Sequence, residues 1–132
     1  MDRPGEFDVV VDRDAMVAMR DGALLATDIY RPAREGEALP GPLPSLLCRA
    51  PYNKDDAEAL SGYGRWFAER GYVSILQDCR GCYASEGDVD FLHPEAEDGF
   101  DTLAWITQQP WSDGRVGTWG TSWCGWTQTG PA

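Results

Sequence analysis

The chain has 132 residues, a length that suits one domain at most. Acidic residues outnumber basic ones by 22 to 11, which gives a formal net charge of −11 and an isoelectric point near 4.3. A surface this acidic repels phosphate backbones and anionic lipid headgroups, so the composition argues against nucleic acid and membranes as partners. An apolar fraction of 42% with six tryptophans excludes a disordered tail and allows a hydrophobic core.

The sequence contains neither a membrane-spanning segment nor a signal peptide by its pattern. No apolar run approaches the roughly 18 residues that a transmembrane helix needs. The N-terminus lacks a basic region followed by an apolar stretch. We therefore expect a cytoplasmic location, where the four cysteines (Cys48, Cys79, Cys82 and Cys124) would be thiols rather than disulfides.

The first predicted elements are two strands joined by a tight turn. Residues 7–20 are rich in Val and Met with polar residues roughly in alternation, which predicts an extended strand with room for a bulge. Asp21-Gly22 is a hairpin signal, and 24–30 predicts a second strand that ends at Arg31-Pro32. Because the turn is so short, these two strands must run antiparallel. Residues 32–44, rich in proline and glycine, are typical of a surface loop.

From residue 45 onward, predicted strands alternate with predicted helices. Strands are expected over 45–48, 72–77 and 115–119, and helices over 63–70 and 95–109, with Gly71 ending the first helix and Asp113-Gly114 turning the chain. In the second helix the predicted buried face consists of Ala96, Phe100, Leu103, Ala104 and Thr107. This alternation predicts an α/β fold with a mostly parallel sheet, covered on both faces and preceded by the antiparallel hairpin.

In such a sheet, reactive groups lie beyond the C-terminal ends of the strands. The segment Gly120-Thr121-Ser122-Trp123-Cys124-Gly125 follows a strand and opens a predicted helix, which is the context of a nucleophile elbow. A serine hydroxyl is a weak nucleophile and must stand exposed on a sharp turn, where a histidine can take its proton. Cys124 stands where the strict Gly-x-Ser-x-Gly pattern has its second glycine, so a serine that merely caps a helix is the alternative.

Several further segments carry a family resemblance in which the order of the motifs is preserved. The chain resembles the N-terminal part of the CocE/NonD family of serine hydrolases, which includes cocaine-esterase-like, acylase and Xaa-Pro dipeptidyl-peptidase-like (peptidase S15-type) enzymes. The matching segments are 19–22 with 28–32, 51–54, 77–81 with 84–87, 97–102, 105–106, 109–114 and 120–128. The resemblance implies an α/β-hydrolase fold, no cofactor, and a small-molecule ester, an amide or a short peptide as substrate.

Roles for individual residues follow from the same resemblance. It implies that Ser122 is the nucleophile, and that the Tyr52 hydroxyl and the Trp123 backbone N–H form the oxyanion hole. Trp123 replaces the family's usual tyrosine, and Asn53 stands where aspartate is more common; neither change removes a donor group. Asp78, Arg80 and Gly81 match a loop beside the active site, and we expect Asp78 and Arg80 to be structural and held by hydrogen bonds.

The catalytic acid and histidine are missing from the expected place. In α/β-hydrolases both follow the serine, but the ten residues after Ser122 include no Asp, Glu or His. The single histidine, His93, precedes Ser122 and stands next to Pro94 before a predicted helix, which is typical of a solvated position. We therefore expect residues 1–132 to form a partial α/β-hydrolase domain cut after the nucleophile elbow, with an inactive fragment or pseudoenzyme as the alternative.

The cysteines and the acidic residues each suggest another class of function. Cys79 and Cys82 have the two-residue spacing of zinc and redox sites. Cys48 and Cys124 also lie toward the C-terminal ends of predicted strands, so one zinc site could use all four thiolates. Only one such pair is present, however, so small buried or half-buried thiols and no bound metal are the preferred interpretation. An acidic binding module has no dedicated motif, and the Asp and Glu residues are explained as a solvated surface.

Overall fold

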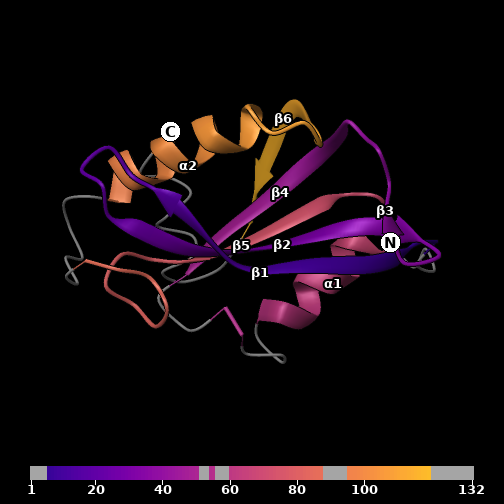
Figure 1. Cartoon of the computed structure of the whole chain (residues 1–132), viewed down its shortest axis with the longest axis horizontal. Helices are drawn as coiled ribbons and strands as arrows, with labels where there is room; N and C mark the ends of the chain where they lie inside the picture. Colours follow the sequence, from indigo (N-terminus) through magenta and orange to yellow (C-terminus); the bar gives the residue numbers. More distant parts are fainter. Residues whose placement is uncertain (1–5, 51–53, 56–59, 88–94, 120–132) are drawn as a thin grey trace.

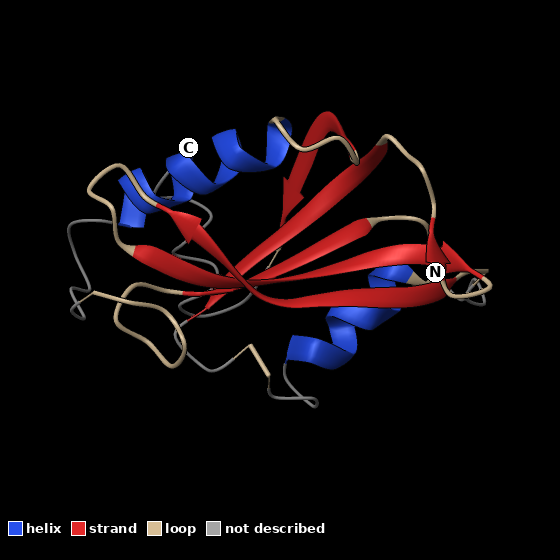
Figure 2. Cartoon of the chain, viewed as in Figure 1, coloured by secondary structure: helices blue, strands red, loops and turns tan. Residues whose placement is uncertain are grey.

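The structure is a computed structural model, and it describes residues 6–50, 54–55, 60–87 and 95–119. Within these residues a single sheet has a helix on each side (Figures 1 and 2). The strands are β1 (Asp8–Ala18), β2 (Leu24–Arg34), β3 (Glu37–Ala38), β4 (Leu43–Ala50), β5 (Val73–Asp78) and β6 (Ser112–Thr118), and the helices are α1 (Gly62–Ala68) and α2 (Glu95–Thr107).

The sheet is mixed, as the sequence predicts. The strand order is β1-β2-β5-β4-β6, with β3 paired to β2. The N-terminal hairpin β1–β2 is antiparallel and joins β5 in an antiparallel pair, whereas β4 is parallel to both β5 and β6. The fold class expected from the alternation of strands and helices is therefore confirmed.

Side chains alternate between the two faces of the central strands and build two core layers. On β2, β4 and β5, Tyr30, Cys48 and Leu76 pack on the α1 side with Leu60 and Ala68. Their neighbours Ile29, Leu47 and Ile75 pack on the opposite side with Ile106 of α2 and with Trp111. Figure 1 shows α1 and α2 on opposite sides of the sheet, so both faces are covered, which explains why β5 is buried along its whole length.

Two expectations about the chain before β4 need correction. Strand β2 does not end at Arg31-Pro32 but continues to Arg34, and residues 32–44 contain β3 as well as loop. Pro32 is tolerated because the pairing of β2 with β5 ends at Tyr30, so the missing N–H of Pro32 costs no hydrogen bond to β5. The Pro32 carbonyl accepts a hydrogen bond from the Leu39 N–H, just after β3.

The buried face of α2 also differs from the prediction. Phe100 is 59% exposed and Thr107 is exposed, whereas Asp98, Thr102 and Ile106 are buried. Asp98 and Thr102 can be buried because each finds polar partners in the interior, which the spacing of apolar residues does not reveal. The turn expected at Asp113-Gly114 is instead an irregularity inside β6, where the register with β4 shifts.

Candidate active site

Three parallel strands end at one edge of the sheet, and the predicted catalytic segments begin there. Ala50 of β4 is the register partner of Asp78 of β5, and the Cys79 N–H donates to the Ala50 carbonyl at 3.0 Å. The Trp119 N–H, just after β6, donates to the Leu47 carbonyl at 3.1 Å. The ends of β4 and β6 therefore lie side by side.

The predicted catalytic residues themselves fall just beyond these strand ends. Tyr52 follows Ala50 by two positions, and Ser122 follows Trp119 by three. Tyr52, Ser122 and Trp123 lie outside the described residues, as does His93, so their roles stay predictions. The described residues show the framework from which the two segments emerge.

Lys54, two positions after Tyr52, is a buried lysine with several polar contacts. The side chain of Lys54 is 1% exposed, and its Nζ lies 2.6 Å from Asp14 Oδ1, 3.1 Å from Asp28 Oδ1 and 3.4 Å from Asp55 Oδ1. Its backbone N–H donates to Asp78 Oδ1 at 2.9 Å. Burial by itself lowers the pKa of Lys54, but the hydrogen bonds to Asp14 and Asp28 outweigh it and raise that pKa. The neighbouring carboxylates therefore favour the charged ammonium form of Lys54.

Asp78 ties together the segments that follow β4 and β5. Its Oδ2 accepts from the Ala84 N–H at 3.3 Å while its Oδ1 holds Lys54. Its carbonyl accepts from Ser85 Oγ at 2.5 Å, and that hydroxyl accepts from the Ala26 N–H of β2. Burial raises the pKa of Asp78, against the hydrogen bonds from Lys54 and Ala84, which lower it. The hydrogen bonds predicted for Asp78 are confirmed.

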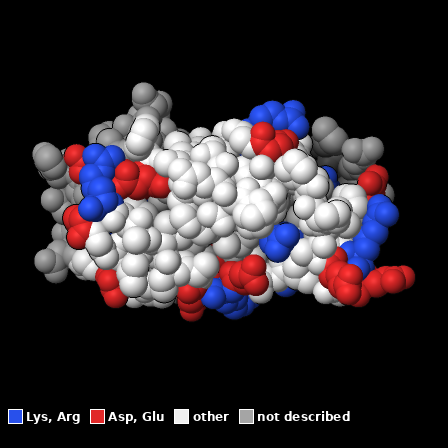
Figure 3. Space-filling model, turned by 45° about the horizontal axis from the view of Figure 1, so that its top comes forward, with Lys and Arg blue, Asp and Glu red and all other residues white. Residues whose placement is uncertain are grey.

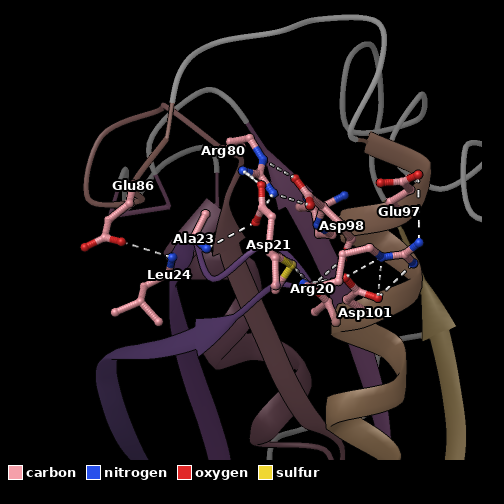
Figure 4. A network of polar contacts seen from close by, with 12 residues as sticks. Arg20, Asp21, Ala23, Leu24, Arg80, Glu86, Glu97, Asp98 and Asp101 are labelled. Atoms are coloured by element: carbon pink, nitrogen blue, oxygen red, sulfur yellow. Dashed lines mark hydrogen bonds and ion pairs between the residues drawn. The ribbon is translucent and has the colours of Figure 1, made fainter.

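Arg80 clamps the loop after β5 to two other elements (Figure 4). Its guanidinium donates to both carboxylate oxygens of Asp98 in α2, at 2.9 and 2.8 Å, and to both of Asp21 in the β1–β2 turn, at 2.7 and 3.1 Å. The hydrogen bonds to Asp98 and Asp21 raise the pKa of Arg80, and the bond from Arg80 lowers the pKa of Asp21. The hydrogen bonds predicted for Arg80 are thereby confirmed. Arg20 and Asp101 form a second bidentate pair beside it.

A buried polar network under this edge was not predicted. The side chain of Gln77 accepts from Arg49 Nε at 2.7 Å and from Thr102 Oγ1 at 3.1 Å, and its amide donates to Thr27 Oγ1 at 3.1 Å. All four residues are at most 2% exposed. The network links β2, β4, β5 and α2 beneath the ends of the parallel strands.

The remaining features of the described residues are the cysteines and the surface charges. Cys48 and Cys79 are buried and Cys82 is half-buried, and no disulfide joins any two of these three, whereas Cys124 lies outside the described residues. Among the residues with a described position, no three His, Cys, Asp or Glu side chains are grouped as a metal site would require. On the face in Figure 3, acidic and basic residues occupy the margins around a broad uncharged centre, and several lie next to a charge of opposite sign. The same part of the chain holds no helix long and apolar enough to cross a membrane.

Comparison with known proteins shows the family to which the chain belongs. Residues 21–132 match the model of the X-Pro dipeptidyl-peptidase (S15) family. The chain belongs to this family. It is 47% identical over 122 residues to cocaine esterase from Rhodococcus sp. (strain MB1 Bresler), an alignment that covers 89% of this chain and 20% of the esterase. The chain therefore spans about a fifth of the length of that curated relative.

Solved structures of family members share the fold. An α-amino acid ester hydrolase matches 99% of this chain and 24% of its own, at 29% identity and a TM-score of 0.78. A CocE/NonD family hydrolase from Staphylococcus aureus matches 91% of this chain and 24% of its own, at 26% identity and a TM-score of 0.76. The predicted family and the α/β-hydrolase fold are thereby confirmed.

Proposed function

We propose that the protein carrying this chain is a serine hydrolase that acts by acyl transfer on small-molecule esters or amides. The observation that carries the proposal is the 47% identity to cocaine esterase, in an alignment that covers 89% of the chain. The second support is geometric, because the ends of β4 and β6, from which the Tyr52 and Ser122 segments continue, lie side by side.

In the proposed mechanism, Ser122 Oγ attacks the carbonyl carbon of the substrate and forms a tetrahedral intermediate. The Tyr52 hydroxyl and the Trp123 backbone N–H donate hydrogen bonds to the oxyanion. Collapse of the intermediate expels the alcohol or amine and leaves an acyl group on Ser122, which water then removes. Proton transfer needs a histidine oriented by an acid. In α/β-hydrolases both residues follow the serine, and this chain aligns with only 20% of cocaine esterase, so we place both in the part of the hydrolase domain that lies beyond these residues.

Hydrolysis of an activated ester such as p-nitrophenyl acetate by the intact protein tests the proposal. We expect Ser122→Ala to abolish turnover, with Ser61→Ala as the matched control, since Ser61 makes no side-chain capping hydrogen bond at the start of α1. Tyr52→Phe should lower kcat by about 10²–10³-fold, the usual effect of losing one oxyanion donor. Tyr63→Phe, at a side chain 53% exposed, is its control. Unchanged turnover in Ser122→Ala would show that the proposed nucleophile is wrong.

A further inference from the structure

Lys54 is held in an arrangement that is unusual for a lysine. It is the only lysine in the chain, its side chain is 1% exposed, and lysines are almost never fully buried unless they are paired. Its ammonium contacts Asp28, whose side chain is fully buried, and Asp14, whose side chain is 56% exposed. A surface lysine serving solubility would need none of these contacts.

The contacts bind one short segment to three strands. Asp14 belongs to β1, Asp28 to β2 and Asp78 to the end of β5, whereas Lys54 follows β4. Asp14 lies in the β1 bulge with a φ of 52°, and its own N–H donates to Asp28 Oδ1 at 2.9 Å. The bulge thus turns the Asp14 carboxylate toward Lys54, as bulges commonly redirect a side chain.

Lys54 is fixed through its backbone as well as through its side chain. The N–H of Lys54 donates to Asp78 Oδ1 at 2.9 Å, and Nζ at the far end of the side chain is held by Asp14 and Asp28. Both the position and the direction of the chain at residue 54 are therefore set. Tyr52 precedes this anchored residue by two positions in the chain.

We propose that Lys54 is a positioning residue, whose buried ammonium, held by Asp14 and Asp28, fixes the segment that carries Tyr52 and so sets where the Tyr52 hydroxyl meets the oxyanion. This inference rests on the role proposed for Tyr52. An oxyanion donor stabilises the transition state more than the bound substrate, so a displaced hydroxyl lowers kcat and leaves KM little changed. A displacement of about 1 Å is enough to cost on the order of 10²-fold in rate.

A double-mutant cycle in the intact protein tests this role, with hydrolysis of an activated ester as the readout. Lys54→Met removes the charge at similar side-chain length, and we expect kcat to fall by roughly 10–10²-fold with KM little changed. In the Tyr52→Phe background the same substitution should change kcat by no more than about twofold, because the donor it positions is already gone. Lys54→Arg, which keeps a cation, should retain more activity than Lys54→Met.

A milder variant keeps the test open where Lys54→Met fails to fold. Asp14→Asn removes a partially exposed carboxylate while asparagine still tolerates the positive φ at this position. It should lower kcat in the wild-type background and not in the Tyr52→Phe background. Arg20→Met is the control for Lys54→Met, because it also replaces a cation by methionine. It removes the bidentate ion pair with Asp101 and should leave kcat unchanged.

The outcomes separate the two proposals. If the Lys54→Met, Tyr52→Phe double variant loses kcat by the product of the two single losses, the two residues act independently. This result would overturn the positioning role and leave Lys54 with a role in stability only. A Tyr52→Phe variant with unchanged kcat would instead refute the role of Tyr52 in the proposed function, and the inference about Lys54 would fall with it. An effect of Lys54→Met on KM alone would likewise contradict positioning of an oxyanion donor.

Discussion

The two carboxylates that hold Arg80 allow a sharp test of how burial sets the strength of an ion pair. Asp98 and Asp21 each accept two hydrogen bonds from the same guanidinium, but the Asp98 side chain is 1% exposed and that of Asp21 is 56% exposed. Substituting each by asparagine removes one negative charge at nearly constant shape. The comparison therefore varies burial while the partner stays the same.

We expect Asp98→Asn to be much the more destabilising of the two. Breaking a fully buried ion pair costs about 3–5 kcal/mol, and Asp21 still balances part of the Arg80 charge, so we expect a loss of about 2–3 kcal/mol. Asp21→Asn should have a much smaller effect, because water replaces an exposed carboxylate at little cost.

Urea denaturation followed by tryptophan fluorescence measures both differences in the free energy of unfolding. Circular dichroism of each variant at zero urea establishes that it is folded before the two are compared. Equal losses from Asp98→Asn and Asp21→Asn, or a loss from Asp21→Asn alone, would refute the reasoning that burial decides the contribution of each carboxylate to this clamp.

Three further predictions concern packing, pH and metal. Gly64→Ala should destabilise the fold by roughly 1–2 kcal/mol in urea denaturation. The added Cβ would lie 3.0 Å from Tyr30 Cε2, and the cost of this overpacking exceeds the gain of about 1 kcal/mol in helix propensity. A more stable variant would contradict the close approach of α1 to the sheet. The hydrogen bond from Arg20 lowers the folded-state pKa of Asp101, so the carboxylate stabilises the fold above its unfolded pKa of about 3.9, and this contribution is lost as the pH falls through the lowered folded value. Asp101→Asn should therefore be less stable than wild type at pH 7 and equally stable in strong acid, and a difference that persists at every pH would refute the assignment. Purified protein should contain no stoichiometric zinc by elemental analysis, and one zinc per chain would contradict the interpretation of the cysteines as thiols.

The hydrophobic pattern predicts the sheet well because its central strands are buried on both faces. The runs at 45–48 and 72–77 lie within observed strands or one residue of them, and the predicted first strand, 7–20, begins one residue before β1 and ends two residues after it. The pattern fails where polar groups are buried. Phe100 fits an apolar face by its spacing but is exposed, because Thr102 and Asp98 occupy the interior with partners from β5 and the loop after it.

Lys54 shows the same limit at the candidate site. The family resemblance includes this residue in the segment 51–54, but its residue type favours the surface and nothing local indicates burial. Its partners Asp14 and Asp28 are 40 and 26 positions away in sequence, and only the pairing of β1 with β2, of β2 with β5 and of β5 with β4 brings the three residues to one place. Contacts of this kind follow from topology, which is not encoded in any short segment.

The proposed nucleophile can be tested without knowledge of the natural substrate. A fluorophosphonate reacts covalently with an activated serine hydroxyl, and peptide mapping by mass spectrometry identifies the residue that carries the adduct. We predict one adduct per intact protein, on Ser122, which is lost in Ser122→Ala together with ester hydrolysis. An adduct on another residue, with hydrolysis retained in Ser122→Ala, would contradict the assignment of this protein as a hydrolase that uses Ser122.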